Sequence, residues 1–401
     1  MTAGTPRTIL CLASYFKGEE FLRECKRRGW FVLLLTSEKH AGKPWPRESV
    51  DELRVMPDLT READVLKGVS WLARSRRIER VVPLDEFDLE VAAAIREHLR
   101  IPGMGSTTAR YFRDKLAMRM RAEEHGIRIP RFTPLFNDGA VREYVSRVPA
   151  PWLVKPRSSA AAIGIRRVDD AAALWTLIER LGDERPLRLL EELLPGDVYH
   201  VDGIVEGRRV LFAAAHRYGR PPMHVAHQGG VATTCTVDRS TSEHAELLEA
   251  NRRVVEALGL VRGVVHVEFL RERSSGELHF IEAAARVGGA YIADVVEAAA
   301  GVQLWREWAR LETSTRQHPY RLPEVRGGHA GLVLSLARQE SPDTSAYDAP
   351  EVVRRLSKRH HAGLIVASDD AARVQSLVED YGRRFEHDFL ASLPPPEKPE
   401  D

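Results

Sequence analysis

Val264-Val-His-Val-Glu-Phe-Leu270 and Leu278-His-Phe-Ile-Glu-Ala-Ala-Ala-Arg-Val-Gly-Gly289 are two short apolar stretches that each carry a carboxylate. The polar segment between them is typical of a hairpin connection, which would pair the two stretches as strands. Because side chains alternate along a strand, Glu282 is predicted to share a face with Phe280. Two neighbouring carboxylates repel each other, so a hard divalent cation is the expected counter-charge beside Glu268 and Glu282.

The composition of the whole chain excludes several classes of protein. The 401 residues are 43% hydrophobic and carry a formal net charge of +1, so two or three domains with real cores are expected. No global field is present to attract nucleic acid or an anionic membrane, and no apolar run has the length of a membrane span. Three scattered cysteines, Cys11, Cys25 and Cys235, lack metal-ligand spacing and fit a reducing cytoplasm.

The order of apolar runs predicts a mixed α/β protein. Residues 7 to about 105 alternate strands with helices, as in a doubly wound parallel sheet, but lack the Gly-x-Gly-x-x-Gly turn of nicotinamide-dinucleotide sites. Further along, 107–125 and 292–311 are each predicted as one helical stretch. The predicted divisions are an N-terminal α/β domain at 1–105, a central domain at 106–325, a small C-terminal α+β domain at 326–393 and a disordered tail at 394–401.

Two lysines stand where a phosphate could be held. Trp152-Leu-Val-Lys-Pro156 is a predicted buried strand, and the small residues that follow it would let backbone N–H groups approach phosphate oxygens beside Lys155. The competing interpretation is a lysine that extends to solvent before an ordinary turn. Asp114 is a predicted helix N-cap, which places Lys115 in the first turn against the helix dipole and suggests an anion partner. A solvated surface lysine would explain that placement equally simply.

Two irregular segments could bind a small molecule. Leu189-Leu-Glu-Glu-Leu-Leu-Pro-Gly196 is either an exposed edge strand or an interdomain hinge whose backbone meets an adenine edge. Residues 217–234 are longer than ordinary connections and could be a mobile loop or a substrate-covering loop. Polar substrate candidates around that loop are His216, Arg217, His227 and Gln228. The chain's histidines show no i, i+4 zinc spacing on a recognisable helix, although His266 shares the face of Glu268.

Five motifs in order carry a family resemblance. They are Arg113-Asp-Lys-Leu-Ala-Met-Arg119, Leu153-Val-Lys-Pro156, Leu190-Glu-Glu-Leu-Leu-Pro-Gly-Asp-Val-Tyr-His-Val-Asp-Gly203, His266-Val-Glu-Phe269 and Ile281-Glu-Ala-Ala-Ala-Arg-Val-Gly-Gly289. Together the motifs resemble the ATP-grasp superfamily, on the branch that holds biotin carboxylase-like proteins and carboxylate–amine ligases. The resemblance covers about residues 8–390 and implies that 106–325 is a two-lobed ATP-grasp domain, preceded by the α/β domain and followed by the small C-terminal domain.

The resemblance implies an ADP-forming ligase that makes carbon–nitrogen bonds. A substrate carboxylate would attack the γ-phosphate of ATP to give an acyl phosphate, and an amine or similar nucleophile would then displace phosphate. The implied roles are phosphate binding by Lys115 and Lys155, adenine binding by Glu191 and the backbone near Glu192 and Leu193, Mg²⁺ (or Mn²⁺) binding by Glu268 and Glu282, and stabilisation of the transferred phosphoryl group by Arg286. Gly288 and Gly289 beside Arg286 are further substrate-site candidates.

Three positions depart from the family pattern. Ala284 stands where an Asn usually supplies a further metal ligand, which puts a second metal site in doubt. The phosphate loop is usually glycine-rich, whereas here it contains Ser158-Ser-Ala-Ala-Ala162. The carboxylate that often binds ribose is replaced by Val198, so Asp197 or His200 could substitute.

Two alternatives to the ligase stay open at this stage. The first is a biotin carboxylase-like enzyme that phosphorylates bicarbonate, and the second is an ATP-binding regulatory protein with impaired catalysis. The expected partners are a small-molecule carboxylate and a nucleophile, with no nucleic acid and no membrane, and a homodimer is left open.

Overall fold

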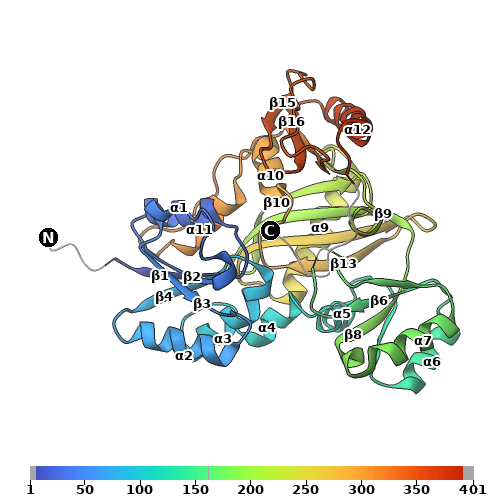
Figure 1. The fold of residues 1–401 in the computed structure, drawn as a ribbon, viewed down its shortest axis with the longest axis horizontal. Helices are drawn as coiled ribbons and strands as arrows, with labels where there is room; N and C mark the ends of the chain where they lie inside the picture. The colour runs from blue at the N-terminus through green and yellow to red at the C-terminus, as the bar shows by residue number, and fades with distance from the viewer. Residues whose placement is uncertain (1–5, 161, 392–401) are drawn as a thin grey trace.

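The N-terminal unit is a parallel four-stranded sheet, as the alternation of strands and helices predicts. The computed structural model describes residues 6–160 and 162–391, so the predicted tail at 394–401 lies outside the described residues. The strand order is β3-β2-β1-β4, with all neighbours parallel. Figure 1 shows this unit in blue beside the N-terminus. Its elements are β1 (Thr8–Ala13), α1 (Glu19–Arg27), β2 (Phe31–Ser37), β3 (Glu52–Met56), α2 (Glu62–Ala73), β4 (Ile78–Pro83) and α3 (Leu89–Leu99).

Strand β1 is buried on both faces, which explains its continuous apolar sequence. Ile9 and Cys11 face helix α1, whereas Leu10 and Leu12 face helices α2 and α3. Strand β3 was not predicted, because its sequence Glu-Leu-Arg-Val-Met lies at the sheet edge and is only partly buried. Such edge strands carry polar residues and lose the apolar signal.

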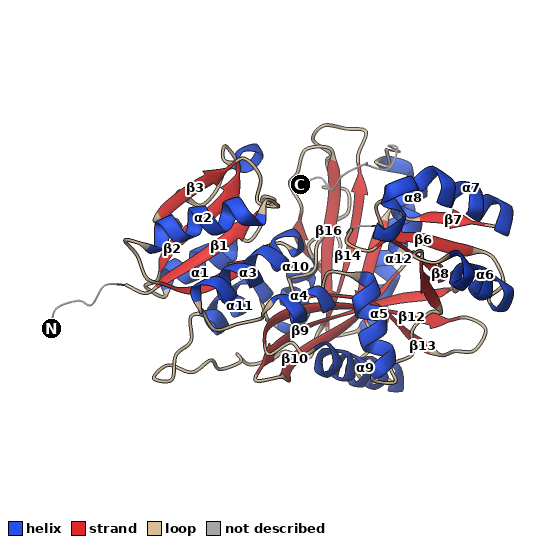
Figure 2. Ribbon diagram, turned by 90° about the horizontal axis from the view of Figure 1, so that it is seen from below, coloured by secondary structure: helices blue, strands red, loops and turns tan. Residues whose placement is uncertain are grey.

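The centre of the molecule is an eight-stranded antiparallel sheet, in the order β13-β12-β9-β10-β11-β14-β16-β15. Strands β14, β16 and β15 belong to the predicted C-terminal domain, yet β14 pairs directly with β11 and so extends the central sheet. Figure 2 shows β14 and β16 above the strands β9 and β10, and β11 lies between β10 and β14 in the sheet. The bounds are β9 (Gly196–Glu206), β10 (Arg209–Tyr218), β11 (Ala232–Thr236), β12 (Arg262–Glu272), β13 (Leu278–Ala284), β14 (His329–Leu336), β15 (Val352–Arg355) and β16 (His361–Ser368).

Helices cover the central sheet and separate it from a smaller lobe. The smaller lobe is a four-stranded antiparallel sheet in the order β5-β8-β6-β7, with helices α6 and α7 packed on it (Figure 1). Its strands are β5 (Phe132–Pro134), β6 (Trp152–Pro156), β7 (Arg166–Val168) and β8 (Arg188–Glu192), and its helices are α6 (Asp138–Arg147) and α7 (Ala171–Leu181). The remaining helices are α4 (Ser106–Tyr111), α5 (Lys115–Glu124), α8 (Pro222–Gln228), α9 (Ser242–Leu258), α10 (Ile292–Ala300), α11 (Leu304–Glu312) and α12 (Ala371–Asp388).

Two predicted helices are each interrupted. The stretch 107–125 divides into α4 and α5, because Asp114 leaves the helical region and caps α5 by accepting a hydrogen bond from the N–H of Leu116 at 3.0 Å. The stretch 292–311 divides into α10 and α11 at Gly301, whose φ of 74° ends α10 in the left-handed region. In each stretch the apolar residues keep a helical spacing across the break, so this spacing alone does not reveal where the helix is interrupted.

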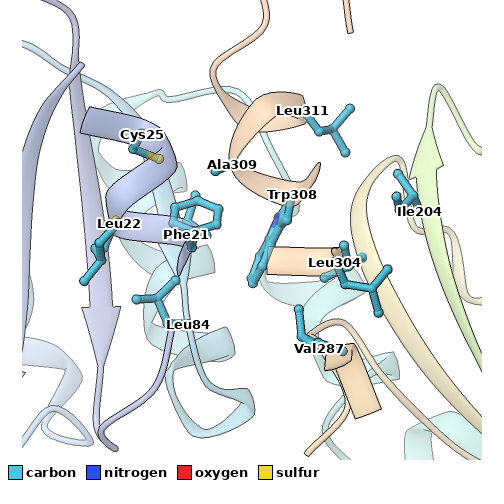
Figure 3. Packing of buried hydrophobic residues seen from close by; sticks show 14 of the residues in the cluster. Phe21, Leu22, Cys25, Leu84, Ile204, Val287, Leu304, Trp308, Ala309 and Leu311 are labelled. Carbon is cyan, nitrogen blue, oxygen red and sulfur yellow. The ribbon is translucent and has the colours of Figure 1, made fainter. Parts of the chain in front are cut away.

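A shared apolar core joins the N-terminal unit to the central sheet. Phe21 of α1 meets Trp308 of α11 edge-on, with ring centroids 5.1 Å apart. Figure 3 shows these two rings between Leu22 and Cys25 on one side and Leu304 on the other. The same cluster includes side chains of β9 and β10. This contact fixes the loops after the N-terminal strands against the central sheet. Among the described residues, no helix is long and apolar enough to cross a membrane.

Candidate active site

Glu268 and Glu282 lie directly opposite each other on the paired strands β12 and β13, as the hairpin pattern predicts. The register then shifts, because Phe269 pairs with Phe280 and leaves Ile281 as the extra residue of a β-bulge. Phe280 therefore packs with Phe269 in the buried cluster on the other side of the sheet. The predicted shared face of Glu282 and Phe280 is wrong, since the bulge reverses the alternation and turns Glu282 towards Glu268.

Lys115 reaches the carboxylate of Glu282 from helix α5. Its Nζ donates to Glu282 Oε1 at 2.7 Å and to the carbonyl of Ser159 at 2.7 Å. The side chain is buried although it opens its helix, so the solvated-lysine alternative does not hold. A small cavity lies here, and it joins the predicted phosphate loop to the carboxylate. It is lined by Lys115, Pro156, Ser159, Ala160, Ala162, Ile163, Ile165 and Glu282.

Lys155 lies in a buried ion cluster with Glu191 and Arg119. Lys155 Nζ binds Glu191 Oε1, Arg119 Nε donates to Glu191 Oε2 at 2.8 Å, and Arg119 Nη2 lies 2.8 Å from the same oxygen. Burial alone would raise the pKa of Glu191, but Arg119 and Lys155 outweigh it and lower that pKa. Burial lowers the pKa of Lys155 despite the Glu191 carboxylate. Glu191, predicted to hold adenine, is thus engaged with two cations, and Arg119 is a site residue that the sequence interpretation missed.

A row of buried polar residues crosses the sheet beside Glu268. Asp202 of β9 accepts hydrogen bonds from two imidazoles, with His200 Nδ1 at 2.6 Å and His266 Nδ1 at 2.9 Å. Burial alone would lower the pKa of His266, but Asp202 and Glu268 raise it to about 9. The imidazoles likewise hold the pKa of Asp202 well below its usual range, against the effect of burial. His200 also contacts Thr234 Oγ1 at 2.9 Å, so its ring is engaged within the sheet and not directed at a ribose.

Arg286 extends from the end of β13 to the N-terminal unit. Its Nη2 and Nε donate to Glu86 Oε1 at 2.8 Å and 3.0 Å. Arg113 Nη1 lies 3.8 Å from the other oxygen of Glu86. Burial alone would raise the pKa of Glu86, but Arg286 and Arg113 outweigh it and lower the pKa to about 2. A carboxylate of the N-terminal unit therefore sets the position of Arg286.

The loop around Glu86 places further acidic side chains near Arg286. Strand β4 runs into Asp85-Glu-Phe-Asp88, and the Asp88 carboxylate accepts from Ser14 N at 2.8 Å and Ser14 Oγ at 2.5 Å. Lys17 forms an ion pair with Asp85. Ser14 follows β1, and β1 and β4 are neighbours where the strand order reverses, which is the usual ligand crevice of such sheets. The sequence feature that could have indicated this part of the site is the presence of three acidic residues among the four residues 85–88, after strand β4.

A second cavity lies at the other end of the phosphate loop. It is lined by Ile165, Arg167, Leu193, Met223, His224, His227 and Gln228. Ile165 lines both cavities, so they adjoin. Part of the predicted irregular segment 217–234 forms helix α8, and His227 Nε2 of that helix lies 3.0 Å from the carbonyl of Ala162 in the phosphate loop. Helix α8 therefore closes over the cavity next to Leu193.

The hinge backbone is already engaged on its donor side. The N–H of Glu192 donates to the carbonyl of Arg131 at 3.0 Å, and the N–H of Leu193 donates to the carbonyl of Pro151 at 3.2 Å. The Glu192 carboxylate binds Arg131 through both the backbone N–H and the guanidinium. The N–H groups of Glu192 and Leu193 are therefore not open to an adenine.

The structure separates the predicted substrate residues. His227 and Gln228 line the cavity beside Leu193. His216 is fully buried and stacks on His200, with centroids 4.8 Å apart and planes 10° apart. Arg217 points to the opposite face of the sheet, where it bonds to Asp197 at 2.8 Å, because neighbouring strand residues alternate.

The glycine pair after Arg286 differs in its surroundings. A Cβ on Gly288 would lie 2.8 Å from Asp202 Oδ1 and 3.1 Å from His266 Nδ1, so this loop rests on the buried row. A Cβ on Gly289 would meet nothing within 4 Å, so it would project into open space.

Comparison with known proteins gives the class of this arrangement. Residues 112–290 match the model of the ATP-grasp domain. An L-arginine-specific L-amino acid ligase of Bacillus subtilis is 24% identical over 282 residues, which are 69% of this chain and 66% of the relative. Carnosine synthase 1 of Homo sapiens is 27% identical over 248 residues, which are 58% of this chain and 29% of the relative. The chain thus spans less than two thirds of either curated relative.

A solved structure agrees with the fold over nearly the whole chain. The L-amino acid ligase from Bacillus licheniformis superimposes with a TM-score of 0.77 at 17% identity, covering 96% of this chain and 99% of that one. The predicted fold class and the ATP-grasp resemblance are confirmed by these matches. The matched residues 112–290 include Lys115, Lys155, Glu268 and Glu282.

Proposed function

We propose that the protein is an ADP-forming ligase that activates a carboxylate as an acyl phosphate and transfers the acyl group to an amine. The observation that carries the proposal is the contact of Lys115 Nζ with both Glu282 and the Ser159 carbonyl, at 2.7 Å each. This contact brings the Lys115 ammonium, a carboxylate suited to bind a metal ion and a loop suited to bind phosphate to one cavity. These are the groups that phosphoryl transfer requires, because its catalysis is mostly positioning and charge neutralisation.

ATP would occupy the two adjoining cavities. Its base would lie beside Leu193 under helix α8, and its phosphates would lie beside Lys115 and the loop that follows Lys155. Lys155 would supply positive charge while Glu191, which Arg119 binds through its other oxygen, holds the Lys155 ammonium in place. The geometry supports this order, since Ile165 lines both cavities.

A divalent cation fits the donor set of Glu268 and Glu282. The two carboxylates face each other across paired strands, and oxygen ligands of this kind suit Mg²⁺ or Mn²⁺. When bound, the cation would neutralise charge on the β- and γ-phosphates. Lys115 pairs with Oε1 of Glu282 and His266 lies beside Oε1 of Glu268, which leaves the second oxygen of each carboxylate for the cation.

The chemistry would then run in two balanced steps. A carboxylate oxygen of the first substrate attacks the γ-phosphorus, the bond to the β-phosphate oxygen breaks, and ADP leaves. The amine of the second substrate attacks the carbonyl carbon of the acyl phosphate, an amide bond forms, and phosphate leaves with loss of the amine proton. Arg286, held by Glu86, would stabilise the negative charge of the acyl phosphate.

We infer that both substrates are amino acids. The B. subtilis relative and the B. licheniformis structure are both named as L-amino acid ligases. The guanidinium groups of Arg113 and Arg286 could donate hydrogen bonds to the carboxylate of an amino acid. Asp85 and Glu86, in the acidic loop after β4, could bind its ammonium group. The loop after β4, together with Arg113 and Arg286, would therefore bind an amino acid.

The free cysteines Cys11, Cys25 and Cys235 support a cytoplasmic setting.

The test is phosphate release from ATP with pairs of amino acids, single amino acids and bicarbonate, with product masses read out. The proposal expects ADP, phosphate and a product whose mass equals two amino acids minus water. Phosphate release with bicarbonate alone would instead support a carboxylase-like enzyme. Tight ATP binding without turnover for any substrate would support the catalytically impaired regulatory protein.

A further inference from the structure

We propose that Asp202 is a positioning residue that acts through His266 to make Glu268 a one-oxygen metal ligand. The inference rests on the proposed function, because it assumes that Glu268 and Glu282 bind the cation of a metal–nucleotide complex. Asp202 itself does not touch the cation in this scheme. Its effect is to fix the ring that borders Glu268.

Asp202 has both carboxylate oxygens engaged. Oδ2 accepts from His200 Nδ1 at 2.6 Å and Oδ1 accepts from His266 Nδ1 at 2.9 Å. The carboxylate is fully buried on the central strand β9, between β10 and β12. Gly288 closes the remaining side, since a Cβ there would lie 2.8 Å from Asp202 Oδ1. With both oxygens used and no room to rotate, Asp202 determines the orientation of the His266 ring.

The orientation of His266 determines which oxygen of Glu268 remains available. His266 Nδ1 is bound to Asp202, so Nε2 points along the sheet to Glu268 Oε1 at 3.5 Å. The hydroxyl of Tyr218 donates to the same Oε1 at 3.1 Å. Both donors therefore approach one oxygen, and Oε2 is the oxygen that no hydrogen bond within the described part of the chain occupies. A carboxylate held in this way binds a cation through one oxygen.

The partner carboxylate is limited in the same manner. Lys115 Nζ occupies Glu282 Oε1, which leaves Oε2 for a cation. Ala284, opposite His266 in the strand register, offers no ligand atom. The two glutamates would then supply two oxygens, whereas Mg²⁺ takes six ligands in an octahedral arrangement. The remaining ligands would be phosphate oxygens and water, so the cation should bind only together with the nucleotide.

The experiment measures Mn²⁺ binding by electron paramagnetic resonance, with the full chain alone and with saturating ADP, and measures ADP affinity without metal by calorimetry. The variants are Asp202→Asn and His266→Gln, and the matched control is Thr236→Val, a buried residue of the same sheet whose hydroxyl bonds only to Ala330 in the described contacts. We expect Mn²⁺ affinity of the ADP complex to fall about 10- to 100-fold in both variants, as for other partners of metal ligands. ADP affinity without metal should change less than about twofold, because Asp202 contributes no nucleotide contact.

The outcomes separate the inference from the proposed function. Wild-type Mn²⁺ affinity in a folded Asp202→Asn or His266→Gln variant would overturn the positioning role, as would a parallel loss of ADP affinity. Tight Mn²⁺ binding by the wild-type protein without ADP would overturn the one-oxygen assignment. If the wild-type protein binds no ADP in the presence of Mn²⁺, the proposed function itself fails. If Asp202→Asn does not fold, His266→Gln carries the test, since the second variant leaves Asp202 paired with His200.

Discussion

The floor and the walls of the active site are built differently. The floor is the central sheet, where Glu268 is contacted by His266 of its own strand β12 and by Tyr218 of strand β10. The walls are helix α5, the smaller lobe and the N-terminal unit, and they reach the floor through long side chains. Lys115 extends from α5 to Glu282, and Arg286 extends from the floor to Glu86.

This difference indicates which parts of the site are preformed. Backbone pairing fixes the strands of the floor, and buried hydrogen bonds fix its side chains, so the floor should keep its geometry without ligands. The walls meet the floor through ion pairs that a ligand can replace: phosphates can compete for Lys115, and a substrate can compete for Arg286. Substrate binding would therefore exchange wall–floor contacts for wall–ligand contacts while the floor remains unchanged.

The largest effect is expected for Glu282→Gln, where floor and wall meet. The variant removes one metal-binding charge and the partner of Lys115, so phosphate release should fall by about 10³-fold or more. The measurement is ADP formation in the amino-acid assay. The control is Glu277→Gln in the same hairpin, where the side chain is 45% exposed and pairs with Arg128. Turnover by Glu282→Gln at the control rate would falsify the metal assignment.

A wall residue should affect nucleotide binding more than the chemistry that follows. Lys155→Met removes positive charge next to the phosphate loop, and ATP affinity should fall about 10- to 100-fold, since a hydrogen bond to a charged group contributes about 1.5–3 kcal/mol. The fold should survive because Arg119 still neutralises Glu191. Calorimetry with a non-hydrolysable ATP analogue measures the affinity, and Lys67→Met, on the exposed face of α2, is the control. Equal affinity of both variants would contradict the role of Lys155.

Arg286→Lys tests the contact between the floor and the N-terminal unit. A lysine keeps the charge but loses the two-donor contact with Glu86, so kcat should fall about 10- to 100-fold with little change in ATP affinity. Steady-state kinetics with ATP and amino acid varied separately resolve the two effects. Glu86→Gln should produce a smaller loss of the same kind, because it loosens Arg286 without removing it. An unchanged kcat in Arg286→Lys would remove Arg286 from the reaction.

The floor was more predictable from the sequence than the walls. Glu268 and Glu282 were placed opposite each other because a hairpin is local and its alternation is visible in the sequence. The bulge at Ile281 was missed, since one extra residue leaves the composition of a strand unchanged. Arg119 and Glu86 were missed for a different reason. Arg119 meets Glu191 across 72 residues of sequence and Glu86 meets Arg286 across 200, and no local pattern records such pairs.

The candidate site follows the same division. Asp114 was predicted as an N-cap from local chemistry, and the structure agrees. Lys115 was predicted to meet an anion, but the identity of that anion in the protein, Glu282, depends on how α5 packs against the sheet. Asp202 belongs to the third family motif, but the sequence assigned it no role. Its two partners, His200 and His266, are two and 64 residues away, and only the fold brings both imidazoles to its carboxylate.

The smallest effect on activity, and a clear effect on stability, is expected for Asp88→Asn within the N-terminal wall. Burial and the neighbouring Asp85 raise the pKa of Asp88 to about 7, from an ordinary value near 3.8. Between these pH values the folded state binds more protons than the unfolded state, so Asp88 makes the free energy of unfolding fall as pH rises, by up to about 1.4 kcal/mol per pH unit. Asparagine cannot titrate and still accepts from Ser14, so the variant should lose this slope and be the more stable protein above pH 7. Urea unfolding from pH 4 to pH 8 measures the difference. If the free energy of unfolding had the same slope against pH in both proteins, Asp88 would already be ionised at pH 5, and the N-terminal wall would be open to water.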